Sequence, residues 1–111
     1  MEDSFDPEGL ARKFGEAGND WADKRAAANS LQRAEKLKRA QRTLEFMKEG
    51  NAVEKSKLLA ESSAEVIEIG KSSDAAEKEA IKARVRYDQI QIFIEMVRSK
   101  ESTARAMINL R

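Results

Sequence analysis

Five cations in the first half of the chain have the types and the spacing that suit contact with a ligand. At 100° per residue they share an arc of about 120° of one helix. This basic stripe consists of Lys24, Arg25, Lys36, Arg39 and Arg42. Cations in such a line can follow a phosphate backbone, so one hypothesis is nucleic-acid binding, which Arg84, Arg86 and Arg98 would extend. We favour the alternative, a solvated face that pairs with acidic residues of the same assembly, because the net charge of the whole chain is only +1.

Catalytic chemistry is not expected from this sequence. Its 111 residues include no Cys and no His, which removes thiol nucleophiles, imidazole bases and most zinc and iron sites. No glycine-rich stretch has the spacing of a phosphate-binding loop, and the Glu and Lys residues stand at the spacing of helix-surface pairs. We therefore predict no enzyme, no cofactor and no metal site.

Another group of residues suits contact with a partner protein: Trp21, Arg98, Glu101 and Arg105. Trp21 is the only tryptophan, and it either anchors a partner or covers the core of its own chain. Glu101 interrupts an apolar line near the C-terminus, flanked by the two arginines at helical spacing. It either pairs across a dimer and sets the register, or lies in solvent where the apolar line frays. Both alternatives stay open.

Charge alternates along the chain in blocks. Residues 1–23 have a net charge of −5, 24–48 of +6, 49–82 of −3 and 83–111 of +3. Antiparallel pairing of such blocks, within one chain or between chains, is electrostatically favourable at modest salt.

The fold expected is all-α, an elongated antiparallel helical hairpin with the character of a coiled coil. Charged residues make up 37% of the chain and aromatic residues only 5%, a composition typical of long helices. Asp6 and Pro7 form a helix-start pattern, but two glycines follow, so residues 1–19 are predicted to be a loose N-terminal arm. Asp20 then offers a cap for a helix over 20–49, which Gly50 ends in a left-handed C-cap.

Two further helices are expected after this turn. Asn51 and Glu54 match a capping box, which predicts a helix over 52–69 that follows a loop of about two residues. Loops that short join antiparallel neighbours. The stretch from Gly70 to Asp74 is either a kink or a chain reversal before a helix over 75–109. Residues 20–111 would thus form the hairpin.

Residues 85–99 contain an alternation of apolar and polar residues that resembles a β-strand. The apolar positions nevertheless fit two interleaved helical stripes, and no turn signal flanks them, so a helix is predicted. One stripe runs through Tyr87 and Val97, and the other comprises Ile81, Val85, Ile92 and Met96. The stripe through Tyr87 and Val97, together with a stripe on the first helix, predicts the seam of a hairpin or an oligomer. The residues of this seam are Leu37, Leu44, Met47, Tyr87, Ile90, Ile94 and Val97. Since the face over 85–97 is wider than one partner helix would cover, we expect a homo-oligomer, most simply a homodimer.

Three stretches, residues 19–36, 51–66 and 83–108, resemble a group of short helical proteins carried by bacteriophages and prophages. A signature in the last stretch comprises Glu95, Arg98, Ser99, Glu101, Ser102, Arg105 and Ala106. The resemblance implies a phage origin, early genes near recombination and replication functions, and residence in the host cytoplasm. It assigns no catalytic residue. The middle of the first helix, "AQRTLEF", is less apolar than in that group.

The function expected is that of a non-enzymatic interaction protein, either an accessory of DNA recombination or replication or an inhibitor of a host protein. Its expected partners are a second copy of itself and an unknown host or phage protein. Direct nucleic-acid binding through the basic stripe is the alternative. No membrane partner is expected, because no apolar run is long enough to span a bilayer.

Overall fold

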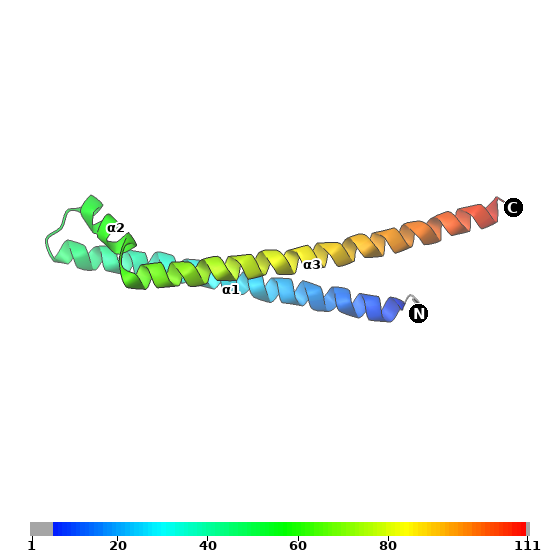
Figure 1. Ribbon diagram of the computed structural model, residues 1–111, viewed down its shortest axis with the longest axis horizontal. Helices are drawn as coiled ribbons and strands as arrows, with labels where there is room; N and C mark the ends of the chain where they lie inside the picture. The colour runs from blue at the N-terminus through cyan, green and yellow to red at the C-terminus, as the bar shows by residue number, and fades with distance from the viewer. Residues whose placement is uncertain (1–5, 111) are drawn as a thin grey trace. The chain divides into compact units, whose positions relative to one another are not determined.

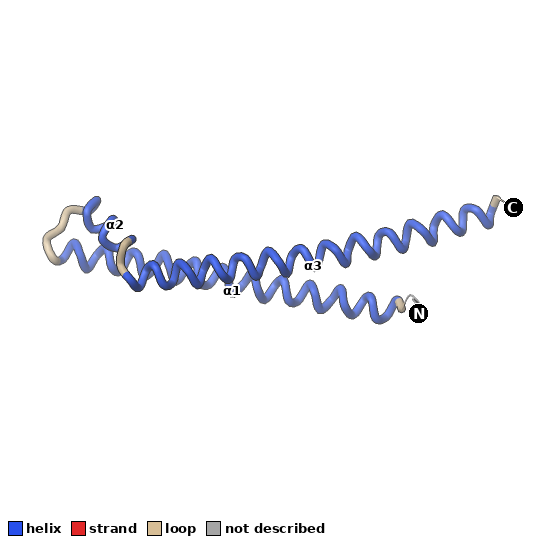
Figure 2. The backbone as a smooth tube through the Cα atoms, in the orientation of Figure 1, coloured by secondary structure: helices blue, strands red, loops and turns tan. Residues whose placement is uncertain are grey.

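The computed structural model describes residues 6–110, and these residues form helices joined by short turns (Figures 1 and 2). In chain order the helices are α1 (Pro7–Lys48), α2 (Val53–Glu61) and α3 (Ala64–Asn109). No strand occurs within residues 6–110, so the alternation over 85–99 belongs to a helix, as predicted. The all-α class and the antiparallel helical hairpin are confirmed.

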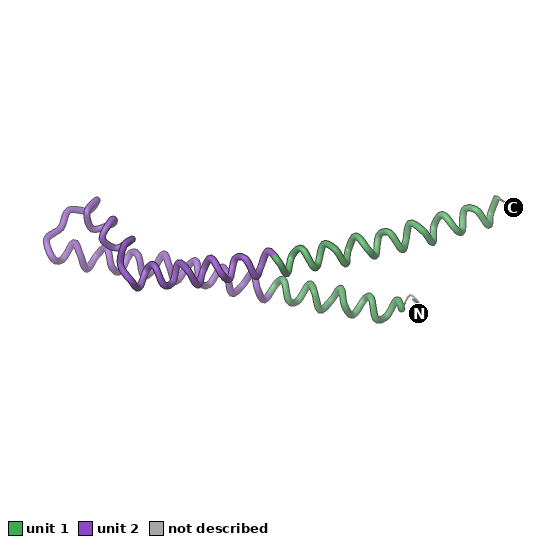
Figure 3. The backbone as a smooth tube through the Cα atoms, viewed as in Figure 1, with its two compact units in different colours: residues 1–22, 82–111 green, residues 23–81 purple. Residues whose placement is uncertain are grey.

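The residues divide into two compact units, each built from parts of both long helices (Figure 3). Unit 1 comprises residues 1–22 and 82–111, of which the structure describes 6–22 and 82–110. Unit 2 comprises residues 23–81. In unit 2, Arg25 meets Glu77 and Lys38 meets Glu65, so α1 and α3 run antiparallel there. In unit 1, Phe14 and Trp21 both contact Tyr87, which again places α1 beside α3.

The first helix begins earlier than predicted. Its first turn closes with a hydrogen bond from the Leu10 amide to the Asp6 carbonyl, and Pro7 occupies the first helical position. The loose arm predicted over 1–19 is therefore wrong for residues 7–19, and the rest of it lies largely outside the described residues. Two exposed or half-buried glycines cost only about 1 kcal/mol each in a helix. The packing of Phe14 and Ala17 offsets that cost, and Asp20 lies inside α1 rather than at its start.

The turn after α1 is built as predicted up to Gly50 and differently beyond it. Gly50 has φ +99°, its amide donates to the Met47 carbonyl, and the Asn51 amide donates to the Phe46 carbonyl, which is the Schellman pattern. The capping box is wrong: the Asn51 side chain turns back to the Phe46 carbonyl, and α2 has Ala52 at its N-cap without a side-chain hydrogen bond. Four residues, 49–52, separate α1 from α2.

The second break in the chain lies at residues 62–63 and not at Gly70. The Ser62 hydroxyl donates to the Leu58 and Leu59 carbonyls, and the Ser63 hydroxyl donates to the Ala60 carbonyl. The Leu58 and Ala60 carbonyls also accept the backbone amides of Ser62 and Ser63, so the two hydroxyls add to the backbone hydrogen bonds that end α2. Gly70 lies within the continuous helix α3, so the chain reversal predicted as one alternative is wrong, while the continuity of the other alternative, one long helix through Gly70, is what the structure shows. The helix predicted over 52–69 is wrong, because α2 ends at Glu61.

Small residues form the core of unit 2. Ala28 and Ala80 are completely buried between α1 and α3, and Ser73 is buried on the same face of α3. Ser56 and Ala60 bury the inner face of α2. Small side chains at a helix contact allow the two backbones to approach closely, which suits two long helices that lie side by side.

Candidate interaction surfaces

Within unit 2, the three arginines of the basic stripe form ion pairs with carboxylates of the same chain. Arg25 donates from Nη1 and Nη2 to the two carboxylate oxygens of Glu77, at 2.8 and 3.1 Å. Gln32 donates to the same carboxylate at 3.3 Å. This hydrogen bond from Arg25 lowers the pKa of Glu77 below its ordinary value of 4.5 and raises the pKa of Arg25. A fork of this kind holds both side chains in a fixed geometry.

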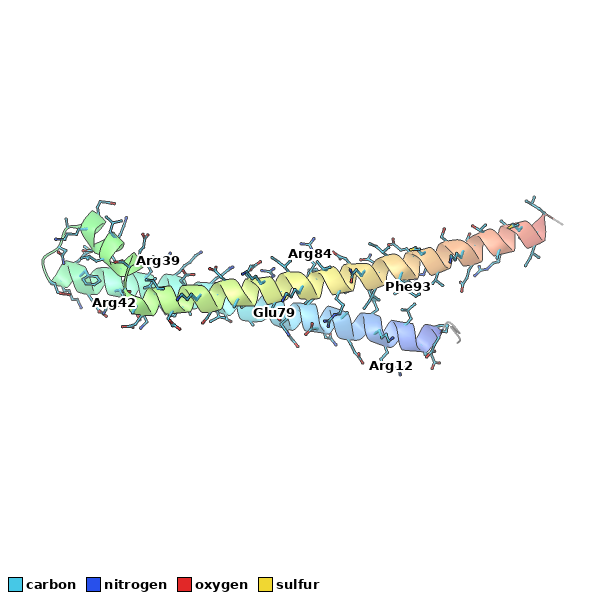
Figure 4. The ribbon with its side chains drawn as sticks, in the orientation of Figure 1. Arg12, Arg39, Arg42, Glu79, Arg84 and Phe93 are labelled. Atoms are coloured by element: carbon cyan, nitrogen blue, oxygen red, sulfur yellow. The ribbon has the colours of Figure 1, made fainter. Side chains whose placement is uncertain are left out.

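The next two arginines of the basic stripe pair along their own helix (Figure 4). Arg39 donates to Glu35 at 2.9 Å, and Arg42 donates to Glu45 and lies 5.2 Å from the Phe46 ring centroid. The Nε atoms of both arginines are buried without a hydrogen-bond partner. These side chains therefore lie against the protein and are not extended toward solvent.

The remaining lysines of this region behave differently from one another. Lys36 is exposed, while Lys24 is half-buried and engaged in an interaction of its own. Lys38, which the stripe did not include, reaches across to Glu65 on α3 at 3.1 Å, and its hydrogen bond lowers the pKa of Glu65. The structure thus breaks the basic stripe into paired arginines and separate lysines, in line with the favoured alternative that these cations pair with acidic residues.

Of the residues predicted to form the seam of a hairpin or an oligomer, those on α3 are half-buried in the hairpin and those on α1 are exposed. Ala83 is buried on α3, and Tyr87, Ile90, Ile94 and Val97 are half-buried on the same face of unit 1. On α1, in contrast, Leu37 and Leu44 are 62% and 57% exposed, and Met47 is exposed as well.

Helix geometry explains why the α1 residues are exposed. Leu37 lies about 120° around the helix from Leu31, which is half-buried, so the two leucines do not share a face. The inner face passes instead through Ala28, Glu35 and Lys38. Glu35 pairs with Arg39, and Lys38 extends its ammonium group to Glu65 at the edge of the contact. The outer leucines stay free for a contact outside the hairpin.

Trp21 belongs to an aromatic cluster in unit 1. The Tyr87 ring stacks on Phe14, with centroids 4.6 Å apart, and is tilted against Trp21 at 5.2 Å. Gly18 lies beside the Tyr87 ring, at a distance where an added Cβ would touch the ring at 3.4 Å. Arg84 lies over the Trp21 ring at 5.7 Å. Trp21 thus helps to cover its own core, and its buried Nε1 has no hydrogen-bond partner.

Toward the termini of unit 1 a groove opens between α1 and α3. It has a volume of about 560 Å³, and its apolar walls come from Leu10, Phe14, Ile94 and Val97. Arg98 and Glu101 line its edge, and Glu101 forms an ion pair with Arg105 of the same helix, with 3.8 Å between Oε2 and Nη2. The structure therefore brings together three of the four candidate partner-contact residues.

A second apolar surface lies on the opposite side of α3. Val85, Ile92 and Met96 share an arc of about 40°, roughly 160° around the helix from the residues that face α1. With neighbouring Phe93 they form an outer stripe, whose members are 48–56% exposed. Phe93 is marked in Figure 4. The helix α3 is thus apolar on two opposite faces, of which α1 covers one.

The sequence analysis did not predict that Leu10, Phe14 and Ala17 belong to an inner face of α1. With Pro7 and Trp21 these residues follow strict 3-4-3-4 spacing, which is the signal that predicts an inner helix face. Gly15 and Gly18, which favour a break in a helix, lie within that stretch and obscure the signal.

Within residues 6–110, no group of three carboxylates converges as a metal site would require, and no helix has the length and apolar character to cross a membrane. No protein-family model matches the chain, and neither does any curated protein or solved structure.

Proposed function

We propose that this chain is a non-enzymatic helical interaction protein of phage or prophage type, which binds another protein through the surface of α3. It would work in the host cytoplasm, either as an accessory of DNA recombination or replication or as an inhibitor of a host protein. The sequence resemblance supports the origin, and the helical surface supports the mode of action.

The outer stripe is the observation on which this proposal rests. A helix that packs against one neighbour needs a single apolar face, whereas α3 has two. The outer stripe exposes about half of each of Val85, Ile92, Phe93 and Met96, which are spread over about three turns of α3. Contiguous exposed apolar side chains of this kind mark protein interaction sites more often than single ones do.

The test is affinity retention from a bacterial lysate with quantification of every protein retained. The informative variant is Ile92→Glu with Met96→Glu, which places charge on the outer stripe. Ile67→Glu with Leu58→Glu is the matched control, because these exposed side chains of unit 2 lie outside the outer stripe. We expect one protein to be retained by the wild type and the control and lost with the outer-stripe variant. Equal retention by all three proteins, or by none, would contradict the proposal.

Direct nucleic-acid binding is the weaker alternative. Arg25, Arg39 and Arg42 are held by carboxylates, which lowers the positive field that the basic stripe would present. Fluorescence anisotropy of labelled single- and double-stranded DNA separates the two functions. Micromolar affinity that falls steeply with salt, and that Lys36→Gln with Arg39→Gln weakens, would favour the nucleic-acid function. We expect no change in anisotropy even at low salt.

A further inference from the structure

A heptad spacing follows the side of α3 that faces away from α1. Seven positions recur at 4-3-4-3-4-3 spacing within unit 1, and every one of them is exposed. They include three residues of the outer stripe, and we call the whole set the outer seam: Val85, Gln89, Ile92, Met96, Ser99, Thr103 and Ala106. The outer seam extends over about 32 Å of helix. This is the spacing by which one helix packs along another in a coiled coil.

The outer seam contains no charged residue, although 37% of the chain is charged. The rest of the exposed surface of the same helical segment is different. Between residues 84 and 106, seven of the other eleven exposed residues carry a charge. An uncharged line on a charged helix is the pattern of a face that packs against another helix. Since α1 lies on the other side of α3, the outer seam is left for a second molecule.

The two flanks of the outer seam carry charges of opposite sign. Arg86 and Lys100 lie on one flank, and Asp88 and Glu95 lie on the other. Arg86 and Asp88 have ionic contacts inside the chain, at 4.0 and 3.9 Å. Glu95 and Lys100 have no ion pair within the part of the chain that the structure describes. These two charges are therefore available to a partner.

Charge selects both the partner and its orientation. When two copies of α3 lie parallel along their outer seams, the acidic flank of each copy meets the basic flank of the other. Glu95 of one copy then lies beside Lys100 of the other, five positions further along the heptads, and two-fold symmetry forms this pair twice. In an antiparallel arrangement each flank meets its own kind, so like charges face each other.

We propose that a second copy of this chain covers the outer seam, with the two α3 helices parallel and in register. The outer seam is complementary to itself in this one orientation, and the contact closes as a dimer because both copies use the same surface. The inference rests on the proposed function, because it names the protein that binds the outer stripe. A lysate protein that is lost with the outer-stripe variant then recognises the dimer.

Sedimentation equilibrium of the purified protein over a range of concentrations tests the contact. Ile92→Glu places a charge at the centre of the outer seam in both copies, and we expect it to weaken the dimer by roughly 100-fold or more. Ile108→Glu is the matched control, since Ile108 is similarly exposed but lies about 160° around the helix from Ile92. It should leave the dimer intact. Circular dichroism at low concentration should show a folded hairpin for both variants.

A charge exchange tests the orientation. Glu95→Lys alone and Lys100→Glu alone each place like charges across the contact, and each should weaken the dimer by about 10-fold. The double variant restores opposite charges and should dimerise like the wild type, as should an equimolar mixture of the two single variants. Glu101→Lys, a control with the same charge change on an exposed residue outside the flanks, should have no comparable effect.

Cross-linking gives an independent readout, because the chain has no cysteine of its own. Ala106→Cys lies at the far end of the outer seam, so its copies meet in a parallel pair and lie at opposite ends of an antiparallel one. A short bismaleimide should join them efficiently. Gln91→Cys, which is exposed on another side of α3, is the control and should give little product.

A monomer at all concentrations, equal weakening by Ile92→Glu and Ile108→Glu, or a charge-exchange double variant that stays weak would each overturn the proposal. Equal cross-linking through positions 106 and 91 would overturn it as well. The proposed function has a separate fate. A monomer that still retains a lysate protein through the outer stripe would contradict the dimer alone, whereas a dimer that retains none would contradict the proposed function alone.

Discussion

Both units are built from parts of α1 and α3, but the side chains that fill the contact between these helices differ. In unit 2 the contact is made by completely buried small residues such as Ala28 and Ala80, and charged side chains bridge its edges. In unit 1 three aromatic rings share the contact, and a groove opens beyond them. Small residues seal a pair of helices completely, whereas large ones fill the space near them and leave apolar walls beyond their reach.

This comparison assigns different roles to the units. In unit 2 the contact between α1 and α3 is closed by buried small residues and bridged by ion pairs, and exposed leucines such as Leu37 and Leu44 lie outside that contact. In unit 1 the contact itself opens into an apolar groove, and the outer stripe adds a second apolar surface, so unit 1 is the half of the molecule from which we expect binding. The following predictions test that division, from the largest expected effect to the smallest.

Enlarging the small-residue core of unit 2 should have the largest effect. Ala28→Leu inserts three carbon atoms into a contact with no free space, and overpacking of this kind should lower the free energy of unfolding by about 3 kcal/mol. Urea denaturation followed by circular dichroism measures it. Ala27→Leu, at the adjacent exposed position, should change the free energy of unfolding by only about 0.5 kcal/mol or less. Equal effects at the two positions would show that unit 2 is not closed in this way.

Removing the central ring of unit 1 should have a smaller and local effect. Tyr87→Ala deletes the side chain that contacts Phe14, Gly18 and Trp21, at a cost of about 2 kcal/mol. Hydrogen exchange should accelerate by roughly 30-fold in residues 7–22 and 82–97. Protection in residues 28–46 and 66–80 should stay unchanged. Loss of protection throughout the chain would mean that the units open together.

Alanine at two glycines should change stability in opposite directions. Gly50→Ala forces a Cβ into the left-handed conformation at the end of α1 and should cost about 1 kcal/mol. Gly15→Ala places a Cβ in open space within the same helix and should stabilise the protein by up to about 1 kcal/mol. Thermal unfolding of the two variants compares them directly. A destabilising Gly15→Ala would argue against a continuous α1 in unit 1.

Acid should weaken unit 2 slightly through its carboxylates. The pKa values of Glu77 and Glu65 are lowered below 4.5 by hydrogen bonds from Arg25 and Lys38. A lowered folded-state pKa stabilises the protein above the unfolded value, and this stability is lost as pH falls below about 4.5 through the folded value. The difference in urea midpoint between wild type and Glu77→Gln should therefore be small at pH 7 and shrink further as pH falls below about 4.5. A difference that grows on acidification would have the wrong sign.

Periodicity predicted the elements that depend on local pattern. The inner face of α3, the turn at Gly50 and the helical character of 85–99 follow from apolar spacing and from backbone geometry, which a sequence displays directly. The alternating charge blocks also indicated antiparallel pairing, within one chain or between chains, and Arg25 and Lys38 of the basic block over 24–48 do meet carboxylates of the acidic block over 49–82.

Other features depend on contacts that are distant in the sequence. Whether Leu37 or Ala28 faces α3 is decided by which residue allows the backbones to approach, not by hydrophobicity alone. Ser62 and Ser63 end α2 by hydrogen bonds to carbonyls, although serines such as Ser72 and Ser73 occur inside α3 without ending it. The groove lies between side chains of α1 and α3 that are about 80 positions apart, such as Leu10 and Ile94, so only the paired helices reveal it.

The single tryptophan offers the most direct test of the central claim, that unit 1 is the open half and unit 2 the closed half. Trp21 lies in unit 1, so its fluorescence reports on that unit alone, while far-ultraviolet circular dichroism reports on all helices. Urea denaturation at low protein concentration should show the fluorescence transition before the main loss of helicity. Coincident transitions would contradict the account, because they would mean that both units unfold as one.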